Sequence, residues 1–199
     1  ISKKYKLKFL SSGLLYRYAS FLILKNQPKN ISNFLKNRFK NLNYSKLNKI
    51  NLHNPIISEH SAKIAKIYKV RKVLKMFQIK FSKKNKNCCI EGRDISTKIL
   101  PKSDLKFFFK CDLSTAAKRR FRELKKINPS IELKEVKKAL RIRNISDTKR
   151  KNSPLLKHRD SVVIDTGKLN KKAMLAQMSI YVEKVISIKK NESSGRIKK

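Results

Sequence analysis

The fold class of this chain is predicted by one stretch, Cys88-Cys89-Ile90-Glu91-Gly92-Arg93-Asp94. Its apolar start lies between two stretches with helical periodicity, which is typical of a buried strand in a parallel sheet. Polar ligands of open α/β sheets bind beyond the carboxyl ends of the strands, where Arg93 and Asp94 stand. Gly92 allows the backbone to turn and to approach closely. For this stretch alone, a turn with a surface ion pair is the alternative.

Short apolar runs and stretches with helical periodicity alternate through the rest of the chain. Strands are predicted at residues 9–10, 88–90, 105–109 and 161–164. Helices are predicted at about residues 14–24, 59–80, 114–127, with Ser114 as its cap, 133–145 and 175–185. Strands that alternate with helices predict an α/β fold with a parallel sheet and helical crossovers.

The charge of the chain is strongly positive. Lys and Arg number 52 against 13 Asp and Glu, which gives a formal net charge of +39 over 199 residues. Such a charge indicates an anionic partner, such as a nucleotide, a nucleic acid or a membrane surface. Compositional drift is the other interpretation, because Lys, Asn and Ile have A/T-rich codons and the lysines are spread along the whole chain. Both interpretations stay open at this point.

Composition also limits the location of the protein. There is no run of about 18 apolar residues to span a membrane, and the first residues do not form a signal peptide. The cysteines are Cys88, Cys89 and Cys111, and their spacing is not that of zinc ligands. We expect them to be free thiols in a reducing compartment. We therefore expect a cytoplasmic chain without a metal-binding site of its own.

Two groups of charged residues are candidates for ligand binding. Arg143, Asp147 and Arg150 are spaced to share one helix face, so that two guanidiniums flank one carboxylate. Such a cluster binds a phosphate, or holds a ribose hydroxyl through the carboxylate; a solvated ion pair is the alternative. The neighbours Arg119 and Arg120 point in different directions on a helix, so one can have a supporting role while the other contacts a ligand.

Several short motifs occur in an order that resembles the bacterial cytidylate kinases. They are Ser12-Gly13-x-x-Tyr16-Arg17; Val70-Arg71 on a helix that ends near Gln78; Gly92-Arg93-Asp94-Ile-x-Thr97; Arg143-x-x-x-Asp147-x-x-Arg150 with Ser153-Pro154-Leu155; and Val163-Ile164-Asp165-Thr166. The ordered set is specific and covers about residues 5–186. The resemblance implies a nucleoside monophosphate kinase that moves the γ-phosphoryl group of ATP, with Mg²⁺, to CMP or dCMP in pyrimidine nucleotide metabolism.

The resemblance also implies roles for the matched residues. Arg17, in the element that includes Ser12, Gly13 and Tyr16, would hold the acceptor phosphate, with Arg93 as its partner. The residues that would line the cytosine pocket are Ser12, Arg71, Asp94 and Arg150. Those that would meet the ribose are Arg143 and Asp147. The lid that closes over the phosphates would carry Arg119 and Arg120, which with Arg93 form the expected catalytic set.

The chain departs from the family pattern at its start. The family opens with a strand, a G-x-x-x-x-G-K-[ST] phosphate loop and a helix, but none of the four glycines here stands in such a motif. Truncation before Ile1 and a degenerate, inactive relative both account for this. Ser11 stands where the family has aspartate, Ala116 replaces a lid arginine, and Ala62 stands where a cytosine-contacting serine is expected.

These observations together predict a domain organisation. We expect a three-layer parallel sheet flanked by helices, with a kinase core at residues 1–25 and 59–188 that includes a lid at about 114–150. Residues 26–58 would form a reduced acceptor-binding insert, and residues 189–199 a basic, disordered tail. The expected partner is CMP or dCMP, bound by a monomer, with no obligate nucleic acid and no membrane. A basic nucleic-acid-binding protein is the alternative.

Overall fold

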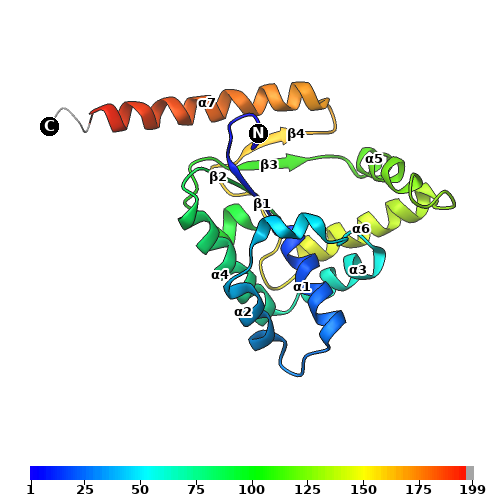
Figure 1. Ribbon diagram of the computed structural model, residues 1–199. Coiled ribbons are helices and arrows are strands. Elements are labelled where there is room, and N and C mark those ends of the chain that lie inside the picture. Colours follow the sequence, from blue (N-terminus) through cyan, green and yellow to red (C-terminus); the bar gives the residue numbers. More distant parts are fainter. Residues whose placement is uncertain (196–199) are drawn as a thin grey trace. The chain divides into compact units, whose positions relative to one another are not determined.

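A computed structural model describes residues 1–195, which divide into two compact units (Figure 1). The N-terminal unit comprises Ser2–Leu100 together with Arg150–Leu155. The C-terminal unit comprises Ile1, Pro101–Lys149 and the chain from Leu156 onward. Each unit is described by itself below.

The N-terminal unit contains a pair of parallel strands, β1 (Lys8–Ser11) and β2 (Cys88–Glu91). Their register places Ser11 opposite Glu91, so the residues that follow the two strands emerge at the same edge. Both strands lie where the sequence predicts them. The prediction that β2 is fully buried is wrong, because Cys88, Cys89 and Ile90 are half-buried and Glu91 is exposed.

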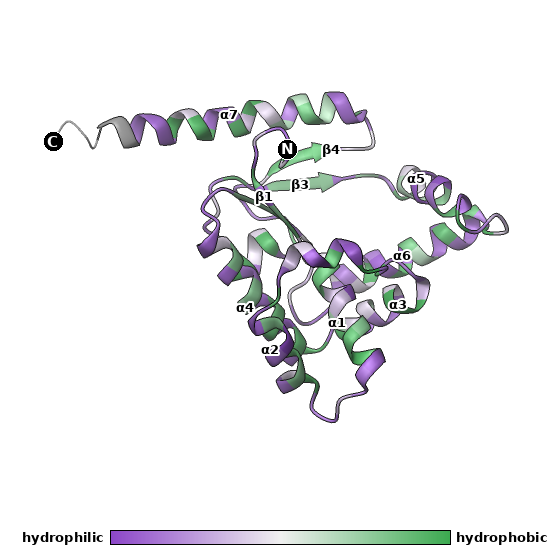
Figure 2. Cartoon of the chain, in the orientation of Figure 1, coloured by the Kyte–Doolittle hydropathy of each residue, from purple (hydrophilic) through white to green (hydrophobic). Residues whose placement is uncertain are grey.

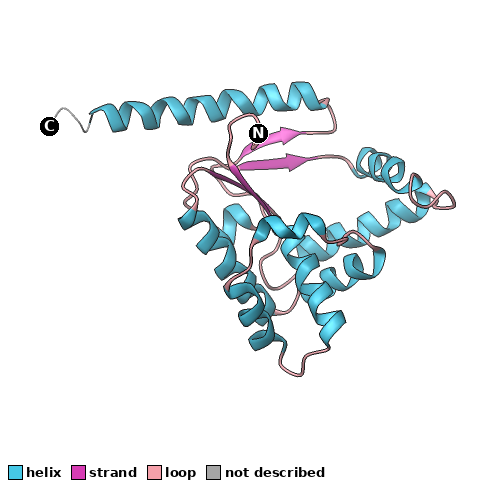
Figure 3. Ribbon diagram, in the orientation of Figure 1, coloured by secondary structure: helices cyan, strands magenta, loops and turns pink. Residues whose placement is uncertain are grey.

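Helices make up most of the N-terminal unit, as Figure 3 shows. They are α1 (Ser12–Asn26), α2 (Ile31–Lys40), the 3-10 helix η1 (Tyr44–Lys49), α3 (Pro55–Ile64), α4 (Tyr68–Lys84) and the short π-helix η2 (Ile95–Ile99). The apolar faces of α1, α2, η1, α3 and α4, together with β1, enclose a core that includes Leu10, Leu15, Leu35, Leu47 and Leu74. Residues 26–58 therefore add short helices to this core.

The helix predicted over residues 59–80 is two helices. α3 ends at Ile64 and α4 begins at Tyr68, with Ala65, Lys66 and Ile67 between them. The apolar stripe continues across this break, which is why periodicity alone did not show it. The break leaves the carbonyl group of Ala65 outside the hydrogen-bond ladder of a helix, and a side chain uses it, as described below.

The C-terminal unit contains a second pair of parallel strands, β3 (Phe107–Lys110) and β4 (Val162–Asp165). Its helices are α5 (Leu113–Lys125), α6 (Leu133–Lys149) and α7 (Lys171–Gly195). The cap of α5 is Asp112 and not Ser114, because the Asp112 side chain accepts a hydrogen bond from the backbone N–H of Thr115 at 2.8 Å.

α7 extends into the stretch expected to be a disordered tail. Figure 2 shows hydrophobic and hydrophilic segments interspersed along it. No proline or glycine occurs between Lys171 and Gly195, and Lys189 pairs with Asp104 at 2.7 Å, so the helix continues through residues 189–195. The remainder of that expected tail, residues 196–199, lies outside the described residues.

An α/β fold with parallel strand pairs and helical connections is confirmed. The strands form a two-stranded sheet in each unit. Among the described helices, none combines the length and the apolar character that a membrane crossing requires.

Candidate functional site

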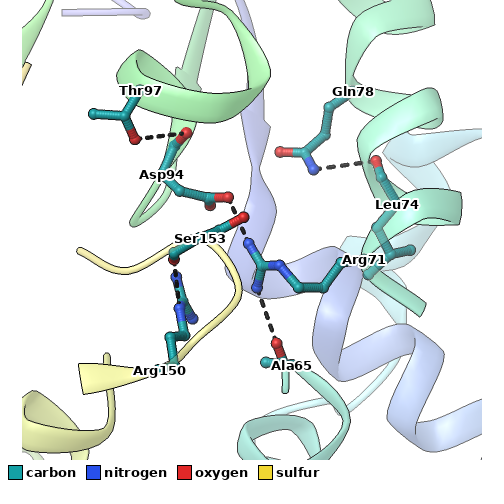
Figure 4. Close-up of polar contacts among 8 residues, drawn as sticks. All are labelled: Ala65, Arg71, Leu74, Gln78, Asp94, Thr97, Arg150 and Ser153. Atoms are coloured by element: carbon teal, nitrogen blue, oxygen red, sulfur yellow. Dashed lines mark hydrogen bonds and ion pairs between the residues drawn. The ribbon is translucent and has the colours of Figure 1, made fainter. Parts of the chain in front are cut away.

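A buried ion pair lies where β2 ends. The Arg71 Nη2 atom lies 2.5 Å from Asp94 Oδ2, and the two side chains are only 8% and 5% exposed. Arg71 Nη1 also donates to the carbonyl oxygen of Ala65 at 2.9 Å, using the group that the break between α3 and α4 leaves available. Figure 4 shows the guanidinium of Arg71 held between Asp94 and Ala65. Its position is therefore fixed by the fold.

Tyr16 lies against this ion pair. The Arg71 Cζ atom is 5.7 Å from the centre of the Tyr16 ring, within the range of a cation–π contact. Burial raises the pKa of the Tyr16 phenol to about 12; the charges of Arg71 and Arg150 oppose this rise, and that of Asp94 adds to it. The phenol is therefore neutral at physiological pH and can both donate and accept a hydrogen bond.

Gly92 brings the turn after β2 close to the start of α1. A Cβ atom on Gly92 would lie 2.9 Å from Ser12 Cβ and 2.8 Å from side-chain atoms of Ile95. Gly92 does not have a positive φ, so room, and not a special backbone conformation, requires glycine here. The helix α1 starts at this point because Ser11 caps it, with its hydroxyl accepting from Leu14 N–H at 3.3 Å. Ser12 is buried beside Gly92, whereas Gly13 is exposed.

Arg150 belongs to the same unit as Arg71 and Asp94. The expectation that it continues a helix face from Arg143 and Asp147 is wrong, because α6 ends at Lys149. Arg150 Nε donates to the carbonyl oxygen of Ser153 at 2.5 Å, and Ser153 has a positive φ of 54° that turns the chain. Arg150 is thus held by its own turn, and its charge reaches Tyr16.

The two arginines expected at the acceptor phosphate also belong to the N-terminal unit. Arg17 Nη1 lies 3.4 Å from Nδ1 of His53, at the surface. Arg93 is exposed and directly precedes the buried Asp94. That Arg17 and Arg93 act as partners stays a prediction.

The remaining candidate residues belong to the C-terminal unit. Arg143 Nε lies 3.9 Å from Asp147 Oδ2 along α6, with side chains 53% and 15% exposed, so the predicted pairing four residues apart is confirmed. On α5, Arg120 Nη1 contacts Glu123 Oε2 at 2.8 Å, and Arg119 is exposed. These cations are accessible to water.

The sequence did not indicate two of the contacts that shape the site. The Ala65 carbonyl could not be found, because a continuous helix would have used it. His53 could not be found either, because it is a lone histidine 36 residues from Arg17. The described residues contain no cluster of three or more His, Cys, Asp or Glu side chains that could hold a metal ion.

The side chains gathered within the N-terminal unit suit a polar, planar ligand. Arg71 and Asp94 supply fixed donors and acceptors, Tyr16 supplies a neutral hydroxyl group, and Arg150 adds positive charge. Since Arg71 and Asp94 are buried and positioned by the fold, a ligand that matches them would meet them with little loss of side-chain freedom.

Comparisons with known proteins agree with the order of the motifs. The family model described as cytidylate kinase matches residues 1–184. A cytidylate kinase of Mesomycoplasma hyopneumoniae (strain 7448) is 33% identical, over 92% of this chain and 85% of the relative. A cytidylate kinase of Fusobacterium nucleatum is 32% identical, over 93% of this chain and 89% of the relative, and one of Rickettsia africae is 28% identical over 94% and 85%. The family predicted from the motifs is confirmed: the chain belongs to the cytidylate kinases, phosphotransferases that act on CMP or dCMP.

Proposed function

We propose that this chain binds CMP or dCMP as the acceptor of a phosphoryl group from ATP. The buried Arg71–Asp94 pair, packed against Tyr16, is the observation that carries this proposal. Cytosine presents a carbonyl oxygen, a ring nitrogen acceptor and an exocyclic amino group. A guanidinium that donates and a carboxylate that accepts are the complementary groups, and burial makes each mismatch costly.

The remaining roles follow from the chemistry of phosphoryl transfer. The transition state spreads negative charge over the phosphoryl oxygens, so catalysis consists mostly of positioning and of positive charge. We assign the acceptor phosphate to Arg17 and Arg93, and the ribose to Arg143 and Asp147. Arg119 and Arg120 on α5 are exposed, which suits side chains that gather around phosphates only when a nucleotide is bound.

The binding of ATP and Mg²⁺ is not explained by these residues alone. The sequence contains no G-x-x-x-x-G-K-[ST] motif, and the described residues contain no metal-binding cluster. We expect the 199-residue chain by itself to have little or no kinase activity, and the addition of a phosphate-loop segment before Ile1 to restore it.

Calorimetric titration of the chain with CMP and with AMP tests the proposed acceptor. CMP should bind more tightly than AMP, because the groups at Arg71 and Asp94 match cytosine. Arg143→Ala should weaken CMP binding by at least tenfold, as expected for the loss of a charge-assisted contact of roughly 1.5–3 kcal/mol. Lys190→Ala, which removes a cation from α7, serves as the matched control. No preference for CMP over AMP would overturn the proposal.

Several finer expectations stay predictions: a single three-layer sheet, a separate acceptor-binding insert at residues 26–58, a monomer and a cytoplasmic location. A nucleic-acid-binding function rests on the net charge of +39, and the family assignment does not favour it. Filter binding at two salt concentrations separates the two functions, because binding to nucleic acid would weaken steeply with salt.

A further inference from the structure

The contact between Arg17 and His53 joins α1 to the loop that precedes α3. Arg17 Nη1 lies 3.4 Å from Nδ1 of His53, across 36 residues of sequence. A guanidinium has only donors, so in this hydrogen bond Nδ1 is the acceptor, which requires the imidazole tautomer with its proton on Nε2. The Arg17 side chain is half-buried, and its contact with His53 at the surface further restricts the rotamers of the guanidinium.

The loop that carries His53 is fixed on both sides. Leu52 is fully buried, and the side chain of Asn51 accepts from the backbone N–H of His53 at 3.4 Å. Asn54 caps α3 by accepting from Ile57 N–H at 2.8 Å. The imidazole is therefore presented by an ordered turn.

A second contact holds α3 to the same face of α1. Ser20, three residues after Arg17, is fully buried. Its hydroxyl lies 2.8 Å from Nδ1 of His60 and 3.2 Å from the carbonyl oxygen of Ile57. Residues three apart share a helix face, so Ser20 anchors α3 where its leading loop can reach Arg17.

We propose that His53 is a positioning residue for Arg17, which it holds ready for the acceptor phosphate. The inference rests on the proposed function, because it takes Arg17 to bind that phosphate. Without His53, the guanidinium loses one of the contacts that restrict it, so more of its ordering falls at the moment of binding, which lowers affinity. The loss should affect only ligands that carry the phosphate.

Calorimetric titration with CMP and with cytidine, which lacks the phosphate, tests this inference. His53→Ala should weaken CMP binding about 3- to 10-fold, the effect expected for one side chain left to be ordered on binding, and should leave cytidine binding unchanged. His53→Asn, whose side-chain oxygen can replace Nδ1 as the acceptor, should recover part of the loss. Lys49→Ala, an exposed cation on η1, is the matched control and should not weaken CMP binding.

The double variant Arg17→Ala with His53→Ala shows whether His53 acts through Arg17. On the Arg17→Ala background, the loss of His53 should have no further effect on CMP binding. An equal effect in both backgrounds, or an equal loss for cytidine, would overturn the inference while leaving the proposed function intact. If the unaltered chain binds cytidine and CMP equally, the phosphate role of Arg17 fails, and the role of His53 fails with it.

Discussion

Each unit holds an arginine–carboxylate pair. The two pairs have similar N–O distances, but one pair is buried and the other is exposed. In the N-terminal unit, Arg71 and Asp94 are 2.5 Å apart and 8% and 5% exposed. In the C-terminal unit, Arg120 and Glu123 are 2.8 Å apart and 45% and 65% exposed. Distance barely distinguishes the pairs, so burial decides what each contributes. A buried pair cannot separate without leaving a charge in a low dielectric, whereas a surface pair exchanges freely with water.

Under the proposed function, this difference would separate recognition of the base from closing of the lid over the phosphates. Groups that must discriminate one base from another benefit from a fixed position, because discrimination depends on the cost of a mismatch. Groups that stabilise a transferring phosphate benefit from freedom to gather around it. Arg71 and Asp94 fit the first description, and Arg119 and Arg120 fit the second.

The largest expected effect is at the buried pair. Asp94→Ala leaves the guanidinium of Arg71 buried without its carboxylate, and should lower the free energy of unfolding by about 3–5 kcal/mol. Urea unfolding followed by circular dichroism measures it. If Asp94→Ala costs no more than Glu123→Ala, burial does not distinguish the two pairs.

A double substitution at the Arg71–Asp94 pair distinguishes its effect on folding stability from its effect on CMP binding. Arg71→Met with Asp94→Leu replaces the buried pair by apolar side chains, and should regain most of the stability lost in Asp94→Ala. CMP binding should not return, because the donors and the acceptor are gone.

A second effect depends on pH. Burial raises the pKa of Tyr16 from 10.0 to about 12, so the folded chain holds the phenol proton more tightly than the unfolded chain does. The stability linked to this proton is fully present below pH 10 and is lost as the pH rises through 12. At 1.36 kcal/mol per unit, the loss is roughly 3 kcal/mol. Unfolding of the wild type between pH 9 and 12 should show it, and Tyr16→Phe should remove most of it.

Tyr44→Phe is the matched control for that measurement. Burial also raises the pKa of Tyr44, but this side chain is less enclosed. Removal of the Tyr44 hydroxyl should leave most of the loss of stability at alkaline pH in place. An unchanged profile in Tyr16→Phe would show that the phenol is not the group responsible.

Crowding at Gly92 gives a smaller effect. In Gly92→Ala, the new methyl group would lie within 2.9 Å of Ser12 Cβ, and such overpacking costs typically about 1–3 kcal/mol. At Gly13, which lies in α1, the nearest atom to a new Cβ is Ser11 Oγ, 3.7 Å away, so Gly13→Ala should be neutral or stabilising. Thermal unfolding of both variants compares them, and equal losses would contradict the close approach.

The smallest effect is expected on α5. Glu123→Ala should change the free energy of unfolding by about 0–0.5 kcal/mol, because its pair with Arg120 is exposed. Salt should reduce even this difference. A loss above 1 kcal/mol in chemical unfolding would mean that the C-terminal pair is more than a surface contact.

Local features of the fold were predictable from the sequence, and long-range ones were not. β1 and β2 were located because apolar runs next to Ser11 and Gly92 mark their ends. The apolar stripe runs through the break at Ala65, so periodicity does not reveal the break. A tertiary hydrogen bond from Arg71 to the Ala65 carbonyl oxygen stabilises the break. Arg150 was assigned to a helix face because spacing alone does not show the left-handed turn at Ser153.

The candidate site shows the same limit. The motif residues Ser12, Tyr16, Arg71, Asp94 and Arg150 do belong to one unit. Their order in the sequence indicated this only through the family resemblance. His53 carried no sequence signal at all, since its proposed role depends on a neighbour that folding brings to it.

The interruption between α3 and α4 has a consequence for how this architecture can vary. Ala65 is tied to Arg71, so a change that moves the end of α3 should move the guanidinium with it. The stretch from Gln27 to Asn54 supplies Leu35 and Leu47 to the core that also holds Leu74 of α4, so its helices cannot be exchanged independently of that core. Chimaeras that swap this stretch should retain the chemistry of Arg71 and Asp94 only where these core positions stay apolar.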